Sequence, residues 1–183
     1  MRVAISGLSG CGNSTVSKLV AEKTGFPRFN YTFHDLARDL GEEFMDFHAK
    51  AASNPGIDLE LDRKQQAFIN ENKHCVVGTR LAVWMDDAKL LEKIGGERVK
   101  LDFKVWLDAP LEERARRVAE REGGSQDEAQ AEVIARDLDN ALRYKKLYGI
   151  DVSKHGFVDL AINSEELTAE EVSQRIVIEL DKR

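Results

Sequence analysis

Short apolar runs alternate with longer amphipathic segments along the whole chain. Runs rich in β-branched and aromatic residues predict buried strands over residues 3–5, 28–31, 74–77, 102–108 and 157–162. The segments between them have apolar residues at helical spacing and typical helix-end signals. Because strands that alternate with helices favour a parallel sheet with helices on both faces, the pattern predicts one α/β domain over residues 1–183 with a five-stranded parallel sheet.

Amphipathic patterns predict the helices and, for two of them, which residues share a face. Helices are predicted over about residues 33–40, 42–54, 57–70 and 126–148, and a final helix follows the capping box Thr168 to Glu171. On the helix 57–70, Asp58, Asp62 and Gln66 are expected on one polar face. On the helix 126–148 the expected buried stripe is Ile134, Leu138, Ala141 and Leu142.

A glycine-rich stretch joins the first strand to the first helix. It matches G-x-x-x-x-G-K-[ST] at Gly7, Gly12 and Ser14, with Asn13 in the lysine position. Glycines at such a turn let successive N–H groups converge on a polyphosphate at a helix N-terminus. The residues expected to bind ATP are Gly7, Leu8, Ser9, Gly10, Cys11, Gly12, Asn13, Ser14 and Thr15, with the Ser14 hydroxyl on Mg²⁺. The plain alternative is a glycine turn that only ends a strand.

Composition narrows the class of protein. The chain has 183 residues, a net charge of −6 and ordinary hydrophobic content of 42%, which suits one globular domain. Without a basic surplus, nucleic-acid binding is not expected as the main activity. Two cysteines without metal-ligand spacing, no signal peptide and no apolar run of membrane-spanning length predict a cytoplasmic protein without a membrane segment.

Arginines recur where a phosphate ligand would need them. Arg80 follows the strand 74–77, at the sheet edge where ligands of open α/β sheets bind, and Arg117 and Arg121 precede a glycine break. With these in place, the chain resembles the nucleoside monophosphate kinases, and within them the short, archaeal-type cytidylate kinases. The similar stretches are the glycine loop and residues 60–65, 80–85, 105–110, 121–123 and 143–151.

The resemblance implies a P-loop NTPase-type fold with two helical insertions, a monophosphate-binding region near 32–73 and a lid near 122–142. It implies transfer of the γ-phosphoryl group of ATP to CMP or dCMP with Mg²⁺, by a monomer whose partners are small nucleotides. Arg80 would grip the acceptor phosphate, Arg117 and Arg121 would clamp the donor phosphates, and the lid arginines Arg136 and Arg143 would meet the transferring group. Acceptor contacts are also expected from His34, Arg38, Asp62 and Arg63, the last two reading cytosine.

Three positions depart from that family's pattern. Asn13 replaces the P-loop lysine, Gly78 stands where an acid usually helps to hold hydrated Mg²⁺, and His34 occupies the place of an arginine. A catalytically impaired nucleotide-binding protein, or a kinase for another small acceptor, therefore remains an alternative. Each arginine also has the alternative of a solvated surface charge, which is the expectation for Arg114 and Arg116. Cys11, at a helix N-terminus, has redox control as a minor alternative.

Overall fold

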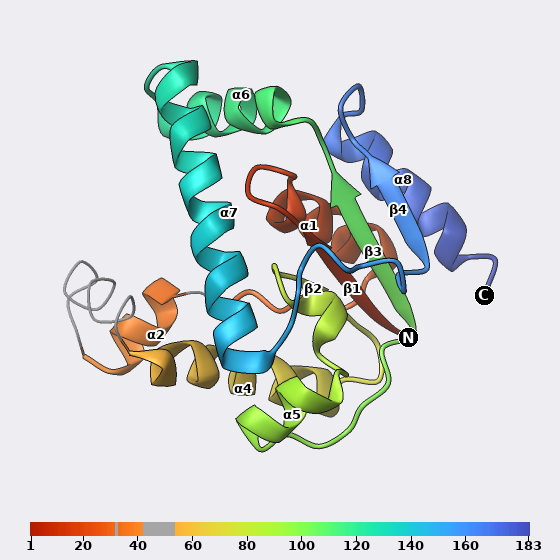
Figure 1. Ribbon diagram of the computed structural model, residues 1–183. Helices are drawn as coiled ribbons and strands as arrows, with labels where there is room; N and C mark the ends of the chain where they lie inside the picture. The colour runs from red at the N-terminus through yellow and green to blue at the C-terminus, as the bar shows by residue number, and fades with distance from the viewer. Residues whose placement is uncertain (32, 42–53) are drawn as a thin grey trace.

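The computed structural model describes residues 1–31, 33–41 and 54–183, with the side chains of residues 33 and 34 excepted. In this part of the chain the sheet has four parallel strands in the order β2-β1-β3-β4. The strands are β1 (Arg2–Gly7), β2 (Cys75–Gly78), β3 (Phe103–Asp108) and β4 (Leu160–Asn163). Their carboxyl ends lie at one edge, towards α6 in Figure 1.

The prediction of a fifth strand over residues 28–31 is wrong. Only Arg28 forms a β-bridge, to Val76, and two backbone hydrogen bonds flank it. Pro27 lacks an N–H group, so pairing cannot extend backwards through it. Beyond Phe29 the chain leaves the sheet towards α2 (Phe33–Asp39).

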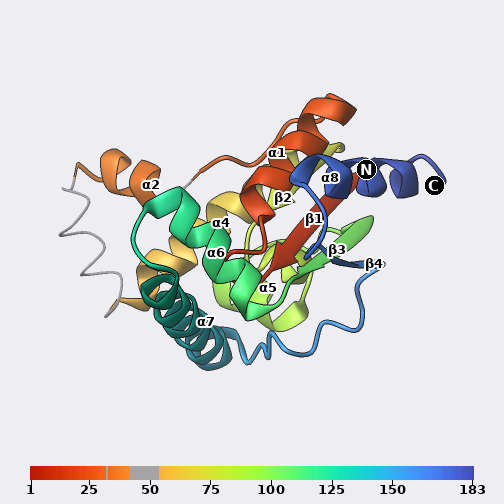
Figure 2. The same ribbon diagram turned by 90° about the horizontal axis from the view of Figure 1, so that it is seen from above.

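Helices cover both faces of the sheet, as predicted. Helices α1 (Asn13–Thr24) and α8 (Ala169–Leu180) pack on one face around Val16, Val20 and Ile176. The turn η1 (Ala82–Trp84), α5 (Ala88–Ile94) and the end of α7 (Gln126–Tyr148) pack on the other. Figure 2 shows the sheet between these two layers. The thirteen glycines include Gly25 and Gly149, which end α1 and α7 in the left-handed conformation.

Two helical excursions flank the carboxyl edge of the sheet. Helix α4 (Pro55–Glu71) begins two residues before the predicted start, because Asn54 caps it and Pro55 occupies its first position. Helix α6 (Leu111–Glu122) packs against the N-terminal part of α7 through Ala115, Val118 and Val133. Most of the predicted helix 42–54 lies outside the described residues. No helix in the described ranges has the length and apolarity to cross a bilayer.

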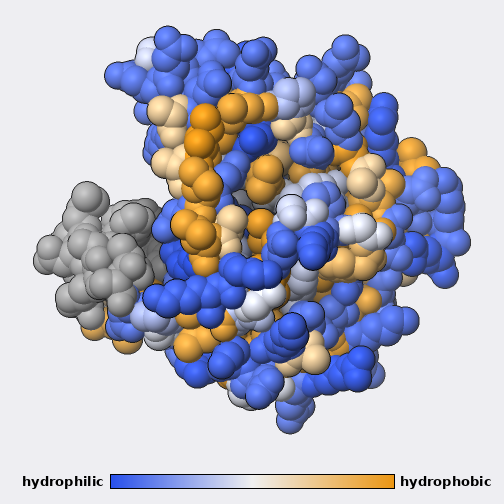
Figure 3. All heavy atoms as spheres, viewed as in Figure 1, coloured by the Kyte–Doolittle hydropathy of each residue, from blue (hydrophilic) through white to orange (hydrophobic). Residues whose placement is uncertain are grey.

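The predicted buried stripe of α7 is wrong. Ile134, Leu138 and Leu142 are 42%, 59% and 70% exposed, and an apolar band runs down the outer side of this helix in Figure 3. The face turned inward carries Asn140 and Tyr144 instead. This inner face meets the P-loop and a polar cavity, so hydrophobicity does not mark the buried side of the helix.

Candidate active site

The glycine loop between β1 and α1 has a geometry that depends on its glycines. Gly10 and Gly12 have φ values of 82° and 92°, a region unfavourable to other residues. A Cβ at Gly10 would also lie 2.7 Å from the carbonyl oxygen of Arg114. Asn13 donates from Nδ2 to the Gly7 carbonyl at 2.8 Å, across the loop. Its Oδ1 is buried and accepts no hydrogen bond.

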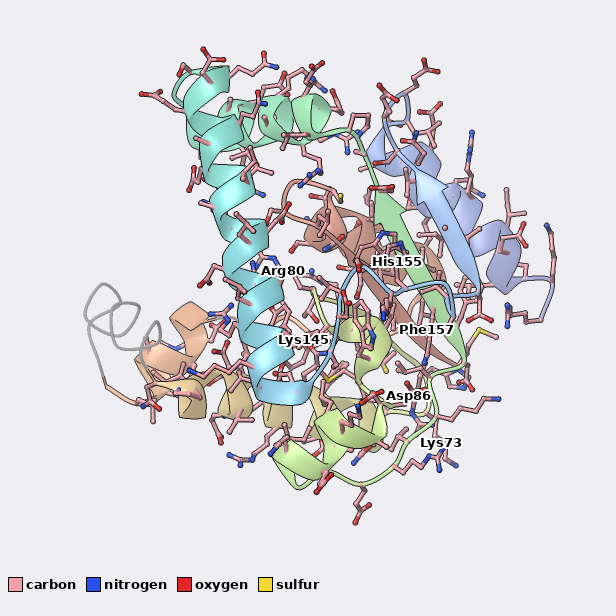
Figure 4. The ribbon with its side chains drawn as sticks, viewed as in Figure 1. Lys73, Arg80, Asp86, Lys145, His155 and Phe157 are labelled. Carbon is pink, nitrogen blue, oxygen red and sulfur yellow. The ribbon has the colours of Figure 1, made fainter. Side chains whose placement is uncertain are left out.

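Ser9 is fixed by three side chains from three separate parts of the chain. Arg80 donates to its hydroxyl at 3.0 Å, Arg114 donates to its carbonyl at 3.0 Å, and its N–H donates to Asp137 Oδ1 at 2.9 Å. Arg114 and Asp137 also form an ion pair at 2.6 Å. The expectation that Arg114 is a solvated surface charge is therefore wrong: it is 7% exposed and connects the loop to α6 and α7. Figure 4 labels Arg80 beside α7.

Two cavities meet at this loop. The α1–α6 cavity has a volume of about 700 Å³ and lies between the start of α1, α6 and the loop that leads into α8. The α4–α7 cavity, about 290 Å³, lies between the P-loop, α4 and α7. Gly10 and Arg121 line both cavities. A ligand that extends from one cavity into the other would pass these two residues.

The cations and carboxylates of the α4–α7 cavity come from different elements and meet at the ion pair between Arg143 and Asp58. Arg80 comes from the loop after β2, Arg121 from α6, and Arg136 and Arg143 from α7. Helix α4 contributes Asp58 and Asp62 with Gln65, and Phe29, Tyr31 and Leu61 add apolar surface. A ligand with an anionic end and a polar ring matches this division.

Unpartnered polar atoms are concentrated in the same cavity. Among the described residues, five side-chain atoms are buried without a hydrogen-bond partner: Asn13 Oδ1, Asp58 Oδ2, Gln65 Nε2, Thr79 Oγ1 and Arg143 Nε. All five residues line the α4–α7 cavity. Asp58 Oδ2 and Arg143 Nε face each other in an ion pair at 3.6 Å, but the atoms of Asn13, Gln65 and Thr79 have no hydrogen-bond partner. Because such a buried polar group costs roughly 1–3 kcal/mol, their concentration indicates a site for a polar ligand.

Burial changes the titration of the two carboxyl groups on α4. It raises the pKa of Asp62 from 3.8 to about 7, against the hydrogen bond that Tyr148 donates to its carboxylate. Burial also raises the pKa of Asp58, while Arg143, whose Nε lies 3.6 Å from Asp58 Oδ2, opposes that rise. The pKa of the Tyr148 hydroxyl is raised by burial and by Asp62.

Several predicted acceptor residues lie elsewhere. Arg63 is on the exposed side of α4 and donates to the Ile94 carbonyl at 2.9 Å, so the structure does not bring it to the cavity with Asp62. Arg38 is exposed and pairs with Asp35 and Asp39. The side chain of His34 lies outside what the structure describes.

The remaining arginines also line the two cavities, and each already has a partner in the protein. Arg117 lines the α1–α6 cavity, where it pairs with Glu113 and donates to Ser164 Oγ at 3.0 Å. Arg136 pairs with Glu122 and Glu132, and Arg143 donates to Asn140 Oδ1 at 2.7 Å. Arg116 also lines the α1–α6 cavity, with its guanidinium half-exposed between Glu113 and Glu120.

Comparison with known proteins identifies the family of this chain. Residues 2–166 match the cytidylate kinase-like family. The chain belongs to this family. It is 34% identical to the cytidylate kinase 2 of Borrelia garinii subsp. bavariensis, over 100% of this chain and 98% of that protein. It is 38% identical to the cytidylate kinase of Natronomonas pharaonis, over 98% and 88%. Among solved structures it is similar in fold to a shikimate kinase from Bacteroides thetaiotaomicron, with a TM-score of 0.61, 19% identity and coverage of 100% and 99%.

The close packing of helix α1 explains why position 78 is a glycine in this protein. A Cβ at Gly78 would lie 2.1 Å from Ser17 Oγ and 2.9 Å from the Asn13 carbonyl oxygen. Helix α1 therefore packs directly against the end of β2, and an acidic side chain at position 78 would displace the helix.

Cys11 is 1% exposed and burial raises the pKa of its thiol to about 11, which disfavours the alternative of redox control.

Some residues of the site were not predicted from the sequence. Gln65 faces the α4–α7 cavity, whereas Gln66, which was expected on the polar face, donates to the Glu97 carbonyl outside it. Asp137 carried no signal beyond its charge. Spacing along α4 was the available signal for Gln65, since residues 58, 62 and 65 follow i, i+4 and i+7.

Proposed function

We propose that this family member is an ATP-dependent kinase that transfers the γ-phosphoryl group of ATP to CMP or dCMP, giving ADP and the nucleoside diphosphate. The observation that carries the proposal is the α4–α7 cavity, with arginines at the P-loop and carboxylates on α4. Its position next to a second cavity supports two nucleotides bound with their phosphates towards each other. The cytidylate kinase names of the relatives support the choice of base.

The arginines perform the electrostatic part of such a transfer. Phosphoryl transfer depends on alignment of the two nucleotides and on neutralisation of the charge that spreads over the transferring group. Arg80, held beside the loop by Ser9, would orient the acceptor phosphate. Arg121 borders both cavities, which supports a role for its guanidinium in neutralising the transferring group. Arg117 would bind donor phosphates, and Arg136 and Arg143, which line the α4–α7 cavity, would meet the transferring group, with residues near 122–142 as the lid.

The residues present fit a magnesium ion that takes most of its ligands from phosphates and water. The Ser14 hydroxyl and the unpartnered Thr79 hydroxyl line the same cavity, and no cluster of three acidic, His or Cys ligands occurs among the described residues. Mg²⁺ is commonly bound this way beside nucleotide phosphates. Ser14 would hold it, and the ion would supply charge neutralisation on the polyphosphate.

The amide of Asn13 favours one alternative, a protein that binds nucleotides with impaired catalysis. Its Nδ2 bonds to the Gly7 carbonyl and brings no positive charge to the loop. A coupled assay of ADP release with CMP, dCMP, UMP, AMP and GMP distinguishes the two. Turnover with CMP and dCMP above the others is expected; ATP binding without turnover of any monophosphate would favour the impaired protein.

A further inference from the structure

We propose that Asp58 and Gln65, on one face of α4, read the base of the acceptor. This inference rests on the proposed function and names the residues that determine its specificity. Both side chains are more than nine-tenths buried, at 5% and 2% exposure, and both line the α4–α7 cavity. Asp58 Oδ2 accepts no hydrogen bond, although it forms an ion pair with Arg143 Nε at 3.6 Å, and Gln65 Nε2 donates none.

The two groups lie on the same side of the helix. Residues 58 and 65 are seven apart, so their directions differ by only about 20° and their Cα atoms by about 10.5 Å along the axis. Helical side chains lean towards the N-terminus, so the longer Gln65 reaches back towards Asp58. Asp62 lies between them, but its carboxylate accepts a hydrogen bond from Tyr148, whereas Asp58 Oδ2 has only the ion pair with Arg143 Nε at 3.6 Å, beyond hydrogen-bond distance. Asp58 and Gln65 therefore keep free hydrogen-bonding capacity, with Tyr31 and Leu61 as apolar walls of the same cavity.

Each group matches one edge atom of cytosine and rejects a different competitor. The Asp58 carboxylate accepts from the exocyclic amine of cytosine, and it would repel the carbonyl oxygen that uracil has at that position. Gln65 Nε2 donates to the ring carbonyl of a pyrimidine, a group that adenine lacks. Asp58 therefore selects against UMP and Gln65 against AMP. Arg63, which donates to α5, has no part in this reading.

The test compares kcat/KM for CMP, UMP and AMP in Asp58→Asn and Gln65→Leu. Because a matched buried hydrogen bond is worth roughly 1–3 kcal/mol, Asp58→Asn should lower the CMP-to-UMP ratio about 10- to 100-fold. Gln65→Leu should lower the CMP-to-AMP ratio by a similar factor, mainly through KM for CMP. A ratio measured on one preparation does not depend on the folded fraction. Gln66→Leu is the matched control, since Gln66 is also buried but bonds to Asn70 and Glu97 outside the cavity, and its ratios should not change.

The outcomes separate this inference from the proposed function. Wild-type turnover of CMP with unchanged ratios in both variants would overturn the base reading and leave the kinase in place. A wild-type enzyme that uses CMP and UMP equally would do the same. If no monophosphate is phosphorylated, the proposed function fails, and melting shifts with CMP and UMP then test the base reading. A CMP preference lost in Asp58→Asn would support it, and equal shifts in the wild type would overturn it.

Discussion

At the scale of single residues, Asn13 contributes a hydrogen bond within the P-loop but not the positive charge of a lysine. Its amide bonds across the loop to the Gly7 carbonyl, which helps to close the loop. It supplies no charge, and the buried Arg114 nearby is already neutralised by Asp137. Arg117 and Arg121 line the α1–α6 cavity and are the cations we expect to meet the charge of a bound polyphosphate, in exchange for their ion pairs with Glu113 and Glu122.

Asn13→Lys should tighten ATP binding. The ammonium would add one cation to a loop that otherwise offers backbone N–H groups and the Ser14 hydroxyl. We expect KM for ATP to fall about tenfold, in line with the roughly 1.5–3 kcal/mol of a charge-assisted hydrogen bond. Steady-state kinetics at saturating CMP measure it, with Lys18→Ala as a control because Lys18 is exposed and pairs with Glu22. An unchanged or higher KM for ATP would show that the position does not face the phosphates.

Asp62 should make stability depend on pH. Its pKa is about 7 in the folded protein against 3.8 ordinarily, so the folded state binds more protons between these values. The free energy of unfolding contributed by this group therefore falls as pH rises from about 4 to about 7 and is level above. An asparagine does not titrate, so Asp62→Asn removes this pH dependence. The free energy of unfolding of the variant relative to the wild type should therefore rise from pH about 4 to about 7. Urea unfolding at several pH values measures the difference; parallel curves would contradict the buried carboxyl group.

At the scale of elements, α7 shows why a helix is easier to predict than the face it buries. Its bounds follow from a capping box at Ser125 and the left-handed Gly149, both visible as residue types in the sequence. Its inner face carries Asp137, Asn140 and Arg143 because it faces the P-loop and a polar cavity. Periodicity assumes that buried means apolar, and that assumption fails where a helix forms the wall of an active site.

The contact of α7 with the P-loop depends on Asp137. Asp137→Asn leaves the buried guanidinium of Arg114 without its ion pair, and removal of one partner of a buried pair typically costs about 3–5 kcal/mol. We expect the free energy of unfolding to fall by about 3 kcal/mol in urea titrations.

Asp139→Asn provides the matched control on the same helix. Asp139 is 72% exposed and 3.9 Å from Arg143, so this change should stay within about 0.5 kcal/mol. Equal effects of the two substitutions would mean that the Arg114 pair does not join α7 to the loop.

At the scale of the whole molecule, the sequence predicts the order of elements but not how they meet. The alternation of strands and helices, the glycine loop and Arg80 are local patterns, and each lies where it was expected. Strand order, the loss of the fifth strand and the node at Ser9 depend on contacts between distant residues, such as Ser9 with Asp137. Arg63 was misplaced for the same reason, since its partner on α5 is distant in sequence.

The arrangement of the two cavities predicts how a single molecule should bind across them. Gly10 and Arg121 border both cavities, so adenosine and cytidine joined through a polyphosphate chain should occupy both at once. The second nucleoside then binds at an effective concentration near the millimolar range, and affinity should exceed that of ATP alone by roughly 100-fold or more. Calorimetric titration measures the affinity. The control is a compound whose polyphosphate chain is too short to let its two nucleosides reach both cavities past Gly10 and Arg121. An affinity for the longer compound no greater than that for ATP would mean that the cavities do not accept two nucleotides end to end.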